Sequence, residues 1–81
     1  SEQVKIDTGL ISRKNLNTVE FKELLRHPYL EFYMVKSIFD YKDVNGGFDS
    51  VAELKNVEMI YDELYRKIAP YLMVNKNNNL P

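Results

Sequence analysis

The sequence matches itself when it is shifted by 30 residues. In each copy, a short stretch with helical apolar spacing is followed, after a few residues, by a longer one. Neither copy alone can bury its apolar face, so the repeat predicts an all-α fold of two short-helix/long-helix units packed about a pseudo-twofold axis. The matching pairs are Phe21 and Val51, Glu23 and Glu53, Leu24 and Leu54, Leu30 and Ile60, Met34 and Leu64, Lys36 and Arg66, Ile38 and Ile68, and Tyr41 and Tyr71.

The first unit has signals for the start and end of both helices. Asn17 is a favourable N-cap, and Glu20 stands where a capping box needs its second residue. Pro28 predicts the end of the first helix, because the residue before a proline is driven out of the α region. The second helix is expected to end at Asn45-Gly46-Gly47, where glycine tolerates a left-handed cap.

The second unit repeats this plan with different residues. Ser50 and Glu53 predict a capping box at the start of a brief third helix, with Phe48 packed against its first turn. The fourth helix is expected to begin near Ile60 or Tyr61 and to end at Pro70. We expect Tyr71, Leu72 and Val74 to form a final irregular turn.

The sequence therefore divides into an extended N-terminal arm (1–16), a tandem domain (17–74, with units 17–45 and 48–74) and a flexible tail (75–81). Apolar residues of the arm could lie over the core: Val4, Ile6, Leu10, Ile11 and Leu16. Central apolar residues of the repeat should form the core, together with Tyr41 and Tyr71: Leu24, Leu30, Met34, Ile38, Leu54, Ile60, Leu64 and Ile68.

Composition excludes several classes of function. The chain has no cysteine, which excludes a disulfide framework, a thiolate zinc site and a cysteine nucleophile. Its 11 basic and 12 acidic residues leave a net charge of −1, so it lacks the excess of positive charge typical of nucleic-acid binding. Its one histidine, His27, has no partner pattern typical of a metal site or a catalytic triad, and we interpret it as a loop residue. We expect no enzyme activity, no cofactor and no metal, because a domain this small has little room for a ligand pocket. We expect no membrane contact, because no long apolar run is present. The chain begins with Ser1, and we expect it to be part of a longer protein.

Several segments together resemble the tandem helix-hairpin-helix domain of ComEA-type competence proteins, which act in DNA uptake. The resemblance rests on Asn15-Leu16-Asn17-Thr18, Glu23-Leu24, Pro28, Ile38-Phe39-Asp40-Tyr41-Lys42, Gly47-Phe48-Asp49-Ser50, Glu53-Leu54, Val57, Leu64 and Ile68-Ala69-Pro70-Tyr71-Leu72. It implies a small all-α bundle, similar to a SAM domain, that binds the backbone of duplex DNA without sequence preference. For a DNA-uptake protein it also implies the bacterial cell envelope.

In this family each hairpin typically reads Gly-apolar-Gly, and its backbone N–H groups hold a phosphate. Here the first hairpin reads Tyr29-Leu30-Glu31 and the second Met59-Ile60-Tyr61, so the apolar residue remains without the glycines. Carboxylates also stand at the following helix starts, on Glu31, Asp62 and Glu63, where they repel a phosphate.

Basic residues offer a second route to DNA. Lys36 and Arg66 are equivalent in the repeat and could straddle a duplex, with Lys67 beside them. Interleaved acidic residues also fit the simpler interpretation, that these are solvated outer helix faces.

The alternative function is a protein-interaction or structural module that kept the scaffold and lost the phosphate sites. Four tyrosines at or near the hairpins could form a tyrosine-rich surface for a protein partner, or could instead cover a thin core. They are Tyr29, Tyr33, Tyr61 and Tyr65.

Overall fold

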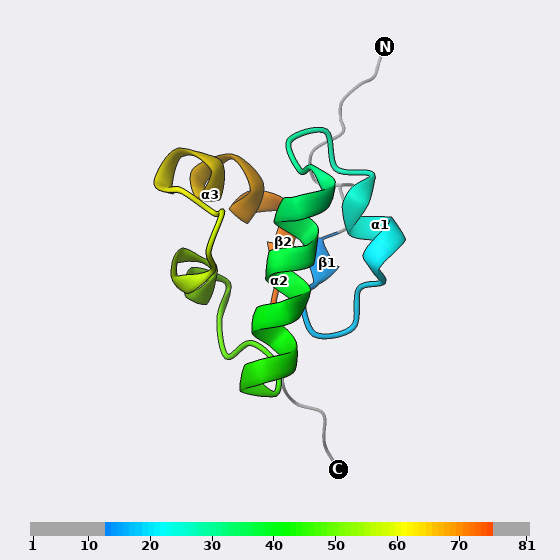
Figure 1. Ribbon diagram of the computed structural model, residues 1–81, viewed down its shortest axis with the longest axis vertical. Helices are drawn as coiled ribbons and strands as arrows, with labels where there is room; N and C mark the ends of the chain where they lie inside the picture. Colours follow the sequence, from blue (N-terminus) through cyan, green and yellow to red (C-terminus); the bar gives the residue numbers. More distant parts are fainter. Residues whose placement is uncertain (1–12, 76–81) are drawn as a thin grey trace.

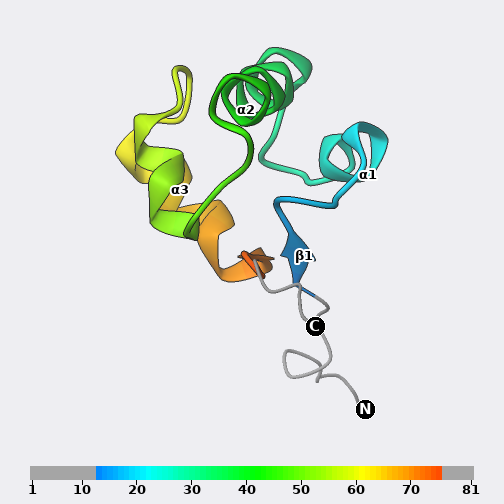
Figure 2. The same ribbon diagram turned by 90° about the horizontal axis from the view of Figure 1, so that it is seen from below.

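The computed structural model describes residues 13–75, and its secondary structure is mostly helical, which confirms the predicted all-α class. The elements are β1 (Lys14–Asn15), α1 (Phe21–Leu25), α2 (Phe32–Asn45), the 3-10 helix η3 (Val51–Asn56), α3 (Asp62–Ile68), the 3-10 helix η4 (Ala69–Tyr71) and β2 (Leu72–Met73). The longest helix, α2, lies at the centre, with α1 and α3 on opposite sides of it (Figures 1 and 2). No helix within the described residues is long and apolar enough to cross a bilayer.

The backbone hydrogen bonds of the two units recur at the 30-residue spacing of the sequence repeat. The turn between α1 and α2 is closed by the Leu30 N–H donating to the His27 carbonyl at 3.0 Å. The equivalent bond, from the Ile60 N–H to the Val57 carbonyl, measures 3.1 Å. The Glu23 N–H donates to the Glu20 carbonyl, and the equivalent Glu53 N–H donates to the Ser50 carbonyl. In the same way, the Val35 N–H donates to the Glu31 carbonyl and the Tyr65 N–H to the Tyr61 carbonyl. The repeat is therefore a repeat of structure as well as of sequence.

Burial follows the same pattern, and all eight core residues predicted from the repeat are buried: Leu24, Leu30, Met34, Ile38, Leu54, Ile60, Leu64 and Ile68. Leu16, Phe48 and Leu72 join them from outside the four predicted helices. The expectation for the two equivalent tyrosines is half right, because Tyr41 packs partly buried against the core, whereas Tyr71 is exposed. Tyr71 belongs to the short helix η4, whose buried neighbours are instead Ile68 and Leu72.

The predicted start of the first helix is wrong by several residues. Helix α1 has Glu20 as its N-cap, and the Glu23 carboxylate accepts the Glu20 N–H at 3.4 Å. Asn17 is used elsewhere, because its side chain bonds to the backbone of Phe48, 31 residues along the chain. Asn17 thus ties two segments together instead of capping a helix.

At the second short helix, Ser50 is the N-cap residue as predicted, but its side chain makes no capping bond. The Glu53 carboxylate accepts the Asp49 N–H at 2.7 Å instead. The helix that follows is 3-10 throughout, whereas its counterpart α1 is an α-helix.

The ends of the described chain pair in parallel, Lys14 with Leu72 and Asn15 with Met73. This pairing corrects the predicted irregular turn after Pro70, because Leu72 continues into a strand. Leu16, the one arm residue within the described range that was expected to cover the core, is buried beside this pair. The other four apolar arm residues and tail residues 76–81 lie outside the described residues.

Candidate nucleic-acid interface

The two hairpins, residues 29–31 and 59–61, connect the short and long helices of each unit. Their central side chains, Leu30 and Ile60, are both 5% exposed and belong to the core. Their burial agrees with the core predicted from the repeat, and these two residues anchor the turns. Their amides are also used, since each closes its own turn. Only the flanking residues of each hairpin remain for a ligand.

The amides of the first hairpin all have intramolecular partners. The Tyr29 N–H donates to Nδ1 of His27 at 3.2 Å, and the Leu30 N–H donates to the His27 carbonyl. The Glu31 N–H lies 3.4 Å from the sulfur of Met34, which is a weak acceptor. A phosphate at this hairpin would have to displace one of these partners.

The second hairpin differs in its backbone conformation. Met59 has φ of 79°, in the left-handed region, and it is the one non-glycine residue of the described chain with positive φ. Left-handed backbone is where glycine is favoured, so Met59 holds a conformation that a glycine would adopt without strain. The amides of Met59 and Tyr61 have no hydrogen-bond partner among residues 13–75.

The basic residues singled out from the sequence have three different environments. Lys36 forms an ion pair with Asp40 at 3.2 Å on the exposed face of α2. The ammonium of Lys67 lies 5.2 Å from the ring centroid of Tyr29. Arg66 is exposed and has no ion-pair partner in the described part of the chain. Of the three, Arg66 is therefore the one without a competing carboxylate or ring.

Carboxylates surround both hairpins, as the sequence indicates. Glu31 is the exposed N-cap of α2, and Asp62 and Glu63 occupy the first turn of α3. Each stabilises the positive end of its helix and opposes a phosphate at the same place. The charges around the two hairpins are consequently mixed.

Each long helix contacts the hairpin of the other unit. The Ser37 hydroxyl of α2 donates a 2.6 Å hydrogen bond to the carbonyl of Glu58, next to the second hairpin. Lys67, which is equivalent to Ser37 in the repeat, lies over Tyr29 in the first hairpin. A twofold relation between the units requires such reciprocal contacts, and they fix each hairpin against the partner unit.

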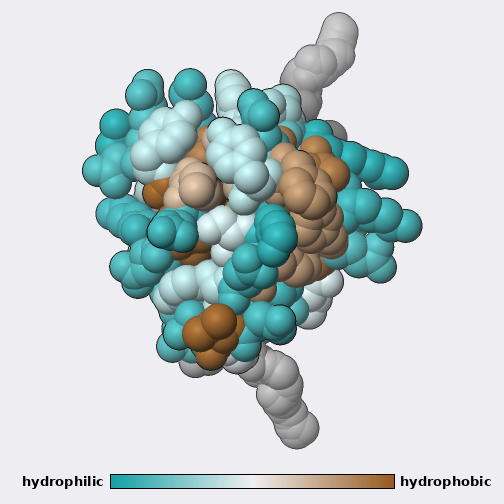
Figure 3. All heavy atoms as spheres, viewed as in Figure 1, coloured by the Kyte–Doolittle hydropathy of each residue, from teal (hydrophilic) through white to brown (hydrophobic). Residues whose placement is uncertain are grey.

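Exposed apolar side chains gather around the hairpins. We define the hairpin surface as Tyr29, Phe32, Tyr33, Met59 and Tyr61, each about half exposed. Figure 3 shows pale side chains over the upper part of α2 and toward α3, and a brown patch on the side of α2 that faces α1. Tyr65, for which the sequence left open a partner surface or a cover for the core, is half-buried, with the Lys55 ammonium 5.1 Å from its ring centroid.

His27 has a role that the sequence did not reveal. Its ring is half-buried, packs edge-on against Tyr71 with centroids 5.0 Å apart, and accepts the Tyr29 N–H. Burial lowers the pKa of His27 below its ordinary value of 6.5, so the ring is neutral at pH 7. The signal that could have found this role is the His-Pro-Tyr order, which places an acceptor two residues before the hairpin amide.

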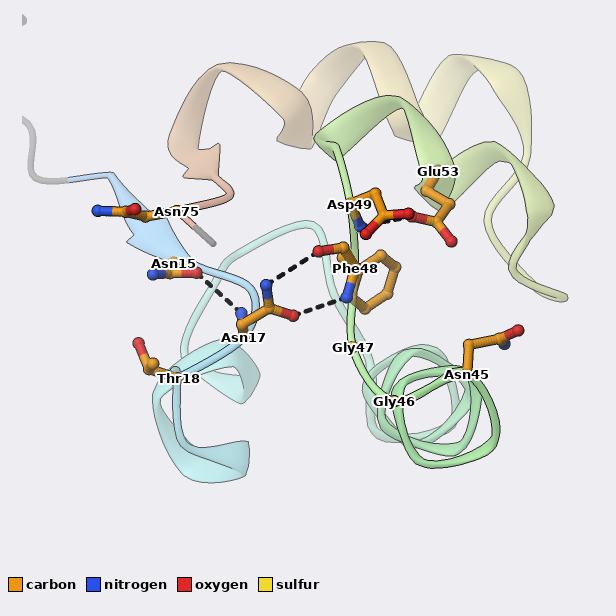
Figure 4. Close-up of a pocket in the computed structure, with 10 residues that line it drawn as sticks. All are labelled: Asn15, Asn17, Thr18, Asn45, Gly46, Gly47, Phe48, Asp49, Glu53 and Asn75. Carbon is orange, nitrogen blue, oxygen red and sulfur yellow. Dashed lines mark hydrogen bonds between the residues drawn. The ribbon is translucent and has the colours of Figure 1, made fainter. Parts of the chain in front are cut away.

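A polar hollow of about 760 Å³ lies away from the hairpins, beside Asn17 and the loop after α2 (Figure 4). Its asparagines serve the fold: Asn17 binds both backbone groups of Phe48, Asn15 accepts the Asn17 N–H, and Asn45 donates to the Tyr41 carbonyl. No group of three or more His, Cys, Asp or Glu side chains suited to a metal occurs within the described residues. The hollow is therefore a structural joint, and the hairpins remain the candidate site.

The family model described as the helix-hairpin-helix motif matches residues 12–73, which is most of the chain. No curated protein matches the chain, and no solved structure does.

Proposed function

This chain belongs to the helix-hairpin-helix family, and on that premise we propose that it is a non-enzymatic module that binds the backbone of duplex DNA weakly and without reading sequence. Residues 17–74, together with β1, make up the proposed module. The ComEA-type competence proteins that the sequence resembles use such a domain in DNA uptake, and we propose the same class of role here.

The observation that carries this proposal is the second hairpin. Met59 adopts a left-handed backbone conformation that favours glycine, and the flanking amides of Met59 and Tyr61 have no partner among residues 13–75. Free backbone N–H groups at a turn are suitable donors to a phosphate oxygen. The exposed guanidinium of Arg66, on the helix that follows, supplies positive charge.

The same site limits the affinity. Asp62 and Glu63 repel a phosphate, Lys36 is paired with Asp40, and the net charge of the chain is −1. At most about two phosphates are then neutralised, one at Arg66 and one at Lys36 once it leaves Asp40, which limits the slope of log affinity against log salt to roughly −2. We expect dissociation constants weaker than about 10⁻⁴ M at physiological salt, tightening modestly as salt is lowered.

The test is a fluorescence-anisotropy titration of a labelled duplex of arbitrary sequence at several salt concentrations. Arg66→Gln should reduce the salt slope by about 1. Lys22→Gln removes one charge from α1, where Lys22 pairs with Glu20 at 3.9 Å, and should affect binding less. Binding that is absent at low salt, or that falls equally in both variants, would contradict the proposal.

A second candidate, a protein-interaction module, is favoured by the hairpin surface. Tyr61 and Phe32 are each 59% exposed, and aromatic side chains of this kind anchor protein interfaces. For this function, a partner purified with the wild-type chain should be retained by Val44→Ser, at an exposed apolar site on α2, and lost with Tyr61→Ser. A chain that binds duplex DNA and retains no such partner would exclude this candidate.

A further inference from the structure

We propose that His27 is a proton-controlled cap on the first hairpin: its neutral ring holds the Tyr29 amide, and its protonation releases that amide to a phosphate oxygen of the DNA backbone. This inference rests on the proposed function, because it names the condition under which the first hairpin also becomes available to the same ligand.

The hydrogen bond between the two residues is the basis of the cap. The Tyr29 N–H donates to Nδ1 of His27 at 3.2 Å, so the neutral ring carries its proton on Nε2. When a solvent proton binds Nδ1, both ring nitrogens become donors and neither can accept. The Tyr29 amide then loses its partner, and a positive charge lies beside it.

Several charged and titratable groups face His27 from the elements packed around it. They are Lys14 of β1, Glu23 and Arg26 of α1, Tyr71 of η4, Tyr29 of the hairpin, and Lys67 of α3, which lies over the Tyr29 ring. The Glu23 carboxylate already pairs with Lys14 at 3.5 Å. Burial also opposes the charged ring, so the cap is closed at pH 7 and opens only in acid.

The charge on His27 matters because Glu31 belongs to the same hairpin. An exposed carboxylate at the N-cap of α2 repels a phosphate. Protonated His27 adds a positive charge to that of Lys67 over the Tyr29 ring, and the released N–H supplies a donor. Both effects act on a phosphate oxygen at Tyr29, which is exposed.

The second hairpin has no equivalent cap. The residue that corresponds to His27 is Val57, which is buried and has no acceptor in its side chain. The equivalent amide, that of Met59, has no partner within residues 13–75. The two hairpins therefore differ in kind: one amide is open at every pH, and the other opens with His27.

The experiment compares three forms of the chain between about pH 5.5 and pH 7.5, a range in which a histidine titrates and most carboxylates do not. In His27→Asn, the side-chain oxygen can accept the N–H two residues on, as in an Asx-turn, so the cap stays closed. In His27→Ala, the amide has no cap at any pH. Because His27 is the one histidine of the sequence, its ring signals in NMR spectra are unambiguous.

We expect the Tyr29 amide signal to shift with the same midpoint as the His27 ring in the wild-type chain and to stay constant in both variants. Affinity for a labelled duplex should rise about three- to tenfold from pH 7.5 to pH 5.5 in the wild type, the effect of about one hydrogen bond. It should change little in His27→Asn.

The readouts separate the two proposals. A Tyr29 amide that does not titrate with His27, or an equal pH response of duplex affinity in wild type and His27→Asn, overturns the cap. Absence of duplex binding at every pH overturns the proposed function, and the Tyr29 titration then decides the cap alone.

Discussion

The side-chain amide of Asn17 is bound to both backbone groups of Phe48: its Nδ2 donates to the Phe48 carbonyl at 2.9 Å, and its Oδ1 accepts the Phe48 N–H at 2.7 Å (Figure 4). This pair joins the segment before α1 to the loop after α2. The buried ring of Phe48 is placed by it, and Gly47 approaches so closely that an added Cβ would lie 3.0 Å from the Asn17 oxygen.

Asn17→Ala should lower the free energy of unfolding by about 1–3 kcal/mol, because it leaves the two half-buried backbone groups of Phe48 without partners. Asn45→Ala is the control, since Asn45 is exposed and bonds only within its own helix, to the Tyr41 carbonyl. Urea unfolding followed by circular dichroism measures both. Equal stability of the two variants would show that the joint contributes nothing.

The buried centre of the repeat should dominate stability. Leu24→Ala and Ile38→Ala remove side chains that are 1% and 0% exposed, and each should cost about 2–5 kcal/mol. Leu25→Ala, at an exposed neighbour of Leu24, should cost much less. Equal melting temperatures for all three variants would contradict the assignment of the core.

The two hairpins should respond oppositely to glycine. Met59→Gly removes the strain of a non-glycine residue in the left-handed conformation. Glycine also raises the conformational entropy of the unfolded chain, which offsets part of this effect, so we expect a net increase of about 0.5–1 kcal/mol in the free energy of unfolding. Tyr29 has no positive φ, so Tyr29→Gly relieves no strain in the folded state. Because glycine raises the entropy of the unfolded chain, the free energy of unfolding should fall by about 0.5–1 kcal/mol. Chemical denaturation of the pair is the measurement, and a change of the same sign in both contradicts the difference in conformation.

Tyr41 should make stability depend on pH through Glu53. The Tyr41 hydroxyl donates a 2.6 Å hydrogen bond to the Glu53 carboxylate, and this bond lowers the pKa of Glu53 below its ordinary 4.5. A carboxyl with a lowered folded pKa stabilises the fold above its unfolded pKa, and this contribution disappears as pH falls through the folded pKa. Tyr41→Phe should therefore lower the melting temperature at neutral pH and differ less from wild type in acid below pH 4.5.

Tyr71→Phe provides the matched control for Tyr41. Tyr71 is its equivalent in the repeat, and its hydroxyl makes no hydrogen bond within the described residues. Its melting temperature should follow the wild type at every pH. A constant difference between Tyr41→Phe and wild type across this range would exclude the linkage to Glu53.

The sequence allowed the core to be predicted because burial at three- and four-residue steps is a local property of a helix. Met34 and Ile38 illustrate this, since they lie four residues apart on α2 and both are buried. The use of Asn17 could not be predicted in that way. A local rule makes it a cap, whereas its partner lies 31 residues away and is determined by tertiary packing.

The same limit applies to the candidate site. The loss of hairpin glycines is visible in the sequence, but which hairpin keeps its open conformation is not. That depends on Met59 having φ of 79° and on His27 occupying the Tyr29 amide. Both are consequences of how two turns with similar sequences pack against different neighbours.

The parallel pairing of β1 with β2 has a mechanical consequence. Because the two strands run in the same direction, tension between the chain entering β1 and the chain leaving β2 pulls them past each other along their length. Their hydrogen bonds, with that from the Leu16 N–H to the Met73 carbonyl at 2.9 Å, are then loaded together in shear and not opened one at a time. Resistance to stretching is thus concentrated in a two-residue ladder, with the buried side chains of Leu16 and Leu72 beside it.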